Sequence, residues 1–70
     1  MKWTIVNFSH ETRANCYRDD GYICNCLQPK GAEKGDTISL IGEEIFSVII
    51  VVTKVKRIGQ LKILRCKELK

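Results

Sequence analysis

The four cysteines are the residues of this sequence with the clearest capacity for chemistry. Cys24 and Cys26 are two positions apart, so on a β-strand their side chains leave the same face. A hairpin that turns at residues 19–21 sets Cys16 opposite Cys24, and Cys66 or His10 could then complete a tetrahedral zinc site. Zinc binding would stabilise so short a chain. The spacing lacks the paired C-x2-C of common zinc sites, so buried free thiols and a disulfide are the alternatives.

Positive charge is concentrated at the end of the chain. Residues 1–53 hold five basic and seven acidic side chains, whereas residues 54–70 hold seven basic and one acidic. Such a segment is typical of a surface that binds nucleic acid, another polyanion or an acidic protein. The alternative is a solvated edge whose lysines prevent aggregation. The candidate binding residues are Lys54, Lys56, Arg57, Lys62, Arg65 and Lys67.

Four of these cations are predicted to share one face of a C-terminal hairpin, namely Lys54, Lys56, Arg65 and Lys67. In this register Lys54 lies opposite Arg65, and because like charges in that position destabilise a sheet, the pair favours an acidic partner such as phosphate. All five aromatic residues precede the basic segment (Trp3, Phe8, Tyr17, Tyr22 and Phe46), so the segment itself contains no ring on which a base could stack. Trp3 is expected to anchor the core.

Catalytic chemistry has little support in the sequence. The single histidine, His10, lies next to Glu11 and near Cys16, but no nucleophile, orienting acid and oxyanion donor occur at a recognisable spacing. No glycine loop of the phosphate-binding type is present. We therefore predict that the protein is not an enzyme.

The longest apolar stretch, residues 44–57, is expected to form the central strand, because β-branched side chains pack well on a pleated sheet. Its first half is apolar at successive positions, which predicts that both faces are covered, and its second half alternates with charge. One of its faces carries Phe46, Val48, Ile50 and Val52. This face is either part of the core or a contact surface for a second copy or a target protein.

The N-terminal half predicts strands at Lys2–Phe8 and Gly21–Leu27. Between them, residues 9–21 allow two structures. Ser9 could cap a short helix near residues 10–18. Alternatively, residues 19–21 form a hairpin loop in which Gly21 supplies the left-handed conformation, and this is the structure we favour. The hairpin sets Tyr17 against Ile23, Cys16 against Cys24 and Ala14 against Cys26.

The C-terminal half predicts a surface loop at Gln28–Gly35 and further strands at Asp36–Ile41 and Leu61–Leu69. A two-residue turn at Gly42-Glu43 would pair Leu40 with Ile45 and Ile38 with Ser47. A similar turn at Gly59-Gln60 would pair Val55 with Leu64, Thr53 with Cys66 and Lys54 with Arg65. About five mostly antiparallel strands with short turns predict one all-β domain over residues 1–70, a small SH3-like antiparallel barrel.

The segment KGDTISLIG, residues 34–42, together with the following β-branched strand that ends in TKV, resembles the G-D-x-I-x-L strand entry of SH3-like and KOW barrels and of PUA- or ASCH-like domains. The resemblance is confined to this segment. It implies a small β-barrel, and it implies binding of RNA or another nucleic acid, which these families often perform.

The sequence contains neither a signal peptide nor an apolar run of the roughly 20 residues that span a bilayer, so an intracellular, cytoplasmic protein without a membrane partner is expected. The leading hypothesis is a small binding module whose basic hairpin contacts nucleic acid or another polyanion. The alternatives are a protein-binding inhibitor or regulator, of the kind that phages and mobile elements encode, and a structural subunit of a homo-oligomer such as a homodimer. No cofactor is expected apart from the zinc ion considered above.

Overall fold

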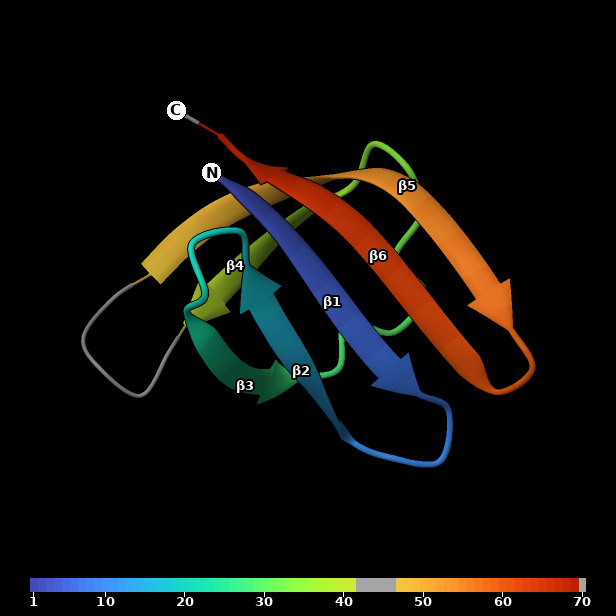
Figure 1. Cartoon of the computed structure of the whole chain (residues 1–70). Helices are drawn as coiled ribbons and strands as arrows, with labels where there is room; N and C mark the ends of the chain where they lie inside the picture. Colours follow the sequence, from blue (N-terminus) through green and yellow to red (C-terminus); the bar gives the residue numbers. More distant parts are fainter. Residues whose placement is uncertain (42–46, 70) are drawn as a thin grey trace.

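The structure is a computed structural model that describes residues 1–41 and 47–69, and these form an all-β protein (Figure 1). The strands are β1 (Lys2–Phe8), β2 (Arg13–Arg18), β3 (Ile23–Leu27), β4 (Thr37–Ile41), β5 (Ser47–Ile58) and β6 (Leu61–Glu68). The helix considered near residues 10–18 is wrong, because most of that segment is strand β2. Across the described residues no helix is long and apolar enough to cross a membrane.

The six strands form one antiparallel sheet in the order β3-β2-β1-β6-β5-β4. Each half of the chain is a three-strand meander, and the halves join where β1 pairs with β6 (Figure 1). The sheet curls until side chains from all six strands share one core, which makes a nearly closed barrel. The prediction of a small antiparallel barrel is therefore confirmed, with six strands in place of about five.

The core follows the alternation of side chains along each strand. On β1, Trp3 and Ile5 point inward, whereas Thr4 and Val6, which alternate with them, are half-buried on the other side of the strand. The buried apolar residues are Trp3, Ile5, Ala14, Cys16, Cys26, Ala32, Leu40, Ile50, Val52, Leu64 and Cys66. The side of the sheet turned away from this core is called the outer face below.

The proposed contact surface on the central strand belongs to this core. Ile50 and Val52 are fully buried and Val48 is half-buried against them, so these side chains are not available to a partner. Phe46 lies outside the described residues. The opposite side of β5 was expected to be covered as well, but Ile49 on that side is 52% exposed.

Two hairpin registers agree with the predictions. In β2–β3, Tyr17 lies opposite Ile23, Cys16 opposite Cys24 and Ala14 opposite Cys26, and Gly21 adopts φ +98° in the loop. In β5–β6, Val55 lies opposite Leu64 and Lys54 opposite Arg65, across the two-residue turn at Gly59-Gln60. Both turns depend on a glycine with positive φ, a conformation that other residues rarely adopt.

Two other pairings differ from the predictions. Ile38 lies opposite Ile50 and Leu40 opposite Val48, so the β4–β5 register is shifted by three residues from the one predicted, and the turn expected at Gly42-Glu43 lies outside the described residues. Thr53 does not face Cys66, because a β-bulge between Val52 and Lys54 leaves Val52 in that position. The Thr53 hydroxyl donates to the Arg65 carbonyl oxygen at 3.0 Å.

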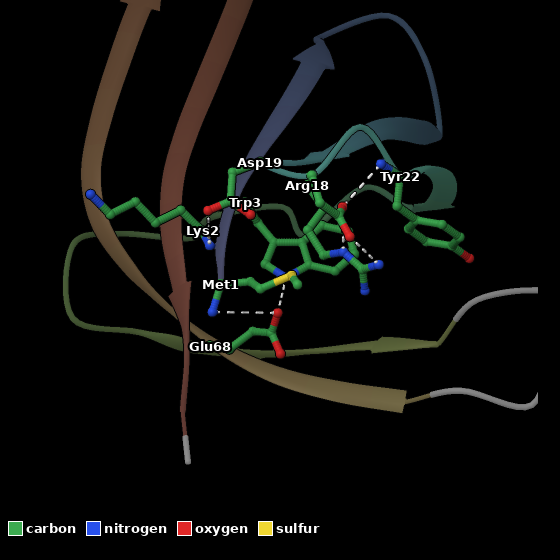
Figure 2. Close-up of polar contacts among 8 residues, drawn as sticks. Met1, Lys2, Trp3, Arg18, Asp19, Tyr22 and Glu68 are labelled. Atoms are coloured by element: carbon green, nitrogen blue, oxygen red, sulfur yellow. Dashed lines mark hydrogen bonds and ion pairs between the residues drawn. The ribbon is translucent and has the colours of Figure 1, made fainter.

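Trp3 is held at one end of the barrel by several contacts (Figure 2). Its indole Nε1 donates to Glu68 Oε2 at 3.0 Å, and the Arg18 guanidinium lies 5.7 Å from the ring centroid. The Tyr22 ring packs edge-on at a centroid distance of 6.1 Å. Glu68 also lies 3.8 Å from the N-terminal ammonium of Met1. The predicted role of Trp3 as a core anchor is confirmed.

Candidate functional site

Five cations gather on the outer face where β1, β6 and β5 run side by side. Lys54 and Lys56 leave β5, Arg65 and Lys67 leave β6, and Lys2 leaves β1 opposite Lys67. In Figure 2 the side chains of Lys2 and Trp3 extend to opposite sides of β1, which places Lys2 outside and Trp3 inside the barrel. We call these five residues the outer basic face. Four were predicted to lie together, and pairing of β1 with β6 adds Lys2.

None of the five cations forms an ion pair within residues 1–41 and 47–69. All five are exposed, so their charges remain solvated in the free protein. Lys54 and Arg65 are nevertheless direct cross-strand neighbours, an arrangement of like charges that destabilises a sheet. The sheet therefore carries an electrostatic cost that a bound anion would relieve.

Arg57 and Lys62 do not belong to this face, although they were predicted as part of the same site. They lie opposite each other two positions beyond the Val55–Leu64 pair, so they share the core-facing side of the hairpin close to its turn. Arg57 lies 3.6 Å from Glu33, and Lys62 borders a separate hollow of about 140 Å³ beside the buried Asn7. The alternation of side chains separates them from the outer basic face.

All residues of the outer basic face except Lys56 line a groove of about 620 Å³. The lining residues are Lys2, Trp3, Thr4, Tyr17, Arg18, Asp19, Thr53, Lys54, Arg65, Cys66 and Lys67. A second hollow, of about 280 Å³, is bordered by Lys54, Lys56, Ile63 and Arg65. Because both hollows include Lys54 and Arg65, they adjoin at that pair and form one track across the sheet, which we call the outer groove.

Tyr17, like Lys2, is a residue of this site that the sequence did not reveal. It lies opposite Thr4, which in turn lies opposite Arg65, so the pairing of β1 with β6 brings an aromatic ring from β2 into the same row as the Lys54–Arg65 pair. The ring is 39% exposed. The signal in the sequence was its position between Cys16 and Arg18, which sends its side chain away from the core when Cys16 points inward.

Asp19 is the one acidic residue that lines the outer groove in the described part of the chain. Its carboxylate accepts from the Lys2 backbone N–H at 3.2 Å, and its own N–H donates to the Lys2 carbonyl oxygen at 3.0 Å. These contacts fix the end of the β2–β3 loop against β1. Asp19 therefore marks the end of the groove and leaves the Lys54–Arg65 pair without a carboxylate beside it among the described residues.

Arg18 is engaged elsewhere, although it also lines the groove. Its guanidinium makes two hydrogen bonds of 2.7 Å to Asp20 and lies 4.8 Å from the Tyr22 ring centroid. The Arg18 guanidinium, helped by the Tyr22 backbone N–H, lowers the pKa of the Asp20 carboxyl to about 2. This ion pair links the end of β2 to the β2–β3 loop beside the groove.

The structure brings three of the four cysteines together and leaves the fourth apart. Cys16 Sγ lies 2.9 Å from Cys26 Sγ, and Cys24 lies directly opposite Cys16, whereas Cys66 is on β6 beyond the intervening strand β1. All four are free thiols. The described residues contain no group of three or more Cys, His, Asp or Glu placed to hold a metal ion.

The surroundings raise the pKa of Cys16, Cys24 and Cys66 and so favour their protonated forms, whereas the contact with Cys16 lowers the pKa of Cys26. Contact with Cys26 and burial both raise the pKa of the Cys16 thiol, and burial raises the pKa of Cys66 to about 11. Protonated thiols are poor nucleophiles and poor metal ligands at neutral pH. Cys16 and Cys66 therefore act as small core residues. His10 packs against the ring of Phe8 at a centroid distance of 5.9 Å.

In comparisons with known proteins, no family model, no curated protein and no solved structure matches this chain.

Proposed function

We propose that this protein is a non-enzymatic binding protein that holds nucleic acid in the outer groove. The observation that carries the proposal is the Lys54–Arg65 pair, two cations side by side where the two hollows adjoin and without an ion-pair partner among the described residues. Phosphate groups that bind there would relieve the repulsion between them and would displace counterions from the nucleic acid. The extended shape of the outer groove suits a chain of phosphates better than a single anion.

The proposal is tested by measuring how binding depends on salt. If three to five of the cations contact phosphates, a plot of log affinity against log salt concentration should have a slope between about −2 and −4.5. Doubling the salt concentration should then weaken binding at least about fourfold. Fluorescence anisotropy of a labelled mixed-sequence oligonucleotide measures this slope. The absence of binding at low salt, or an affinity that does not change with salt, would contradict the proposal.

A second candidate, a protein-binding regulator, is favoured by a different part of the outer face. At the far end of β1, β5 and β6, the side chains of Phe8, Leu61 and Ile58 are successive cross-strand neighbours, and Val6 lies opposite Ile63. Phe8 and Ile58 are exposed, and the other three are half-buried. A protein partner or a second copy of the chain would cover this patch. A native mass spectrum of the untagged protein reports such a partner, a homo-oligomer or co-purified nucleic acid.

A further inference from the structure

Tyr17 gives the outer groove a feature that phosphate binding alone does not require. Its ring stands in the cross-strand row formed with Thr4, Arg65 and Lys54. Neighbouring strands are about 4.8 Å apart, so Tyr17 lies about 10 Å from Arg65 along that row. The small residue Thr4 is the only one of the row between them, and both Thr4 and the partly exposed Tyr17 line the groove.

Within residues 1–41 and 47–69, no aromatic ring pairs with Tyr17. The ring pairs in the described part of the chain are Trp3 with Tyr22 and Phe8 with His10, and neither includes Tyr17. The β2–β3 loop next to Tyr17 is stabilised by the hydrogen bonds of Arg18 with Asp20 and of Asp19 with Lys2. An exposed aromatic ring beside cations in a groove is suited to stacking with a flat group.

Only one form of nucleic acid offers both a free base and adjacent phosphates. In a duplex the bases are stacked inside the helix and cannot reach a ring beside the phosphate track. In a single strand each base is free to turn out and stack, while the backbone continues along the cations. We propose that the outer groove binds single-stranded nucleic acid, with a base stacked on Tyr17 and the neighbouring phosphates on Arg65 and Lys54. This inference rests on the proposed function and adds the form of nucleic acid to it.

The experiment compares three probes of equal length at one salt concentration. They are a mixed-sequence single strand, its duplex, and a single strand in which the bases are replaced by abasic sites. The wild-type protein should bind the single strand about tenfold more tightly than the abasic strand, which is the range measured for stacking of one base. Tyr17→Ala should lose this difference, Tyr17→Phe should retain it, and neither substitution should alter binding of the abasic strand.

Ile23→Ala is the matched control, because Ile23 lies opposite Tyr17 on β3, is exposed, and does not line the groove. It should leave all three affinities unchanged. The circular dichroism spectrum of each variant confirms that it is folded before binding is compared.

The outcomes separate this inference from the function on which it rests. If the wild-type protein binds the duplex or the abasic strand as tightly as the single strand, and does so in a salt-dependent way, the stacking inference is wrong while phosphate binding stands. The same holds if Tyr17→Ala and the wild-type protein bind the single strand equally. If no probe binds even at low salt, both proposals are wrong.

Discussion

Lys54→Glu is expected to weaken oligonucleotide binding by about tenfold or more while making the protein more stable. The loss in affinity arises because one phosphate contact disappears and a repulsive charge replaces it in the outer groove. The gain in stability, about 0.5 kcal/mol, arises because the introduced carboxylate would face Arg65 across β5 and β6, so that an attractive pair replaces a repulsive one. Anisotropy titrations and urea unfolding of the same preparation measure the two effects.

The control for this substitution is Lys30→Glu. It makes the same change in net charge on the loop between β3 and β4, at an exposed position that does not line the outer groove. It should alter affinity less than about twofold, because charges beyond about 10 Å are largely screened at 0.1 M salt. Equal losses in Lys54→Glu and Lys30→Glu would show that net charge, and not the groove, determines binding.

Trp3→Ala is expected to have the largest effect on stability, a loss of about 4 kcal/mol. The substitution removes the largest buried side chain of the core and leaves a cavity in its place. It also removes the hydrogen bond to Glu68 and the ring beneath Arg18. A domain of this size has a total stability of about 3–10 kcal/mol, so the substitution should remove between about two fifths and all of it. Urea unfolding followed by circular dichroism measures the change.

Two further variants identify the source of this stability. Trp3→Phe keeps an aromatic ring but cannot donate to Glu68, so it should cost about 1–2 kcal/mol. Leu27→Ala shortens an apolar side chain that is 72% exposed on the edge strand β3, and it should cost less than about 0.5 kcal/mol. If Trp3→Ala were no more destabilising than Leu27→Ala, the described core would be wrong.

The parts of the fold that could be predicted from the sequence are those fixed by local turn chemistry. The loop at residues 19–21 and the turn at Gly59-Gln60 each contain a glycine in the position that needs positive φ, and the registers on either side follow from these turns. The same reasoning placed Lys54, Lys56, Arg65 and Lys67 on one face. It failed for Ile38 and Leu40, because the register there was counted from a turn at Gly42-Glu43, and the observed pairing is shifted by three residues.

The parts of the site that the sequence did not reveal depend on long-range pairing. Tyr17 and Lys2 enter the outer groove only because β1 pairs with β6, and these strands are separated by most of the chain. No local pattern specifies that neighbour. Arg57 and Lys62 show the converse, since a count of charges in the C-terminal segment includes them, whereas alternation along the strands turns them to the other side of the hairpin.

The most direct test of nucleic-acid binding in the outer groove is an NMR titration of the ¹⁵N-labelled protein with an unlabelled single-stranded oligonucleotide. We expect the amide signals of Thr4, Tyr17, Lys54 and Arg65 to shift together, and to return toward their free positions as salt is added. The signals of the loop at residues 28–36 and of Lys62 should stay in place. Shifts confined to that loop or to the apolar patch around Phe8 and Ile58, or no shifts at low salt, would contradict the account.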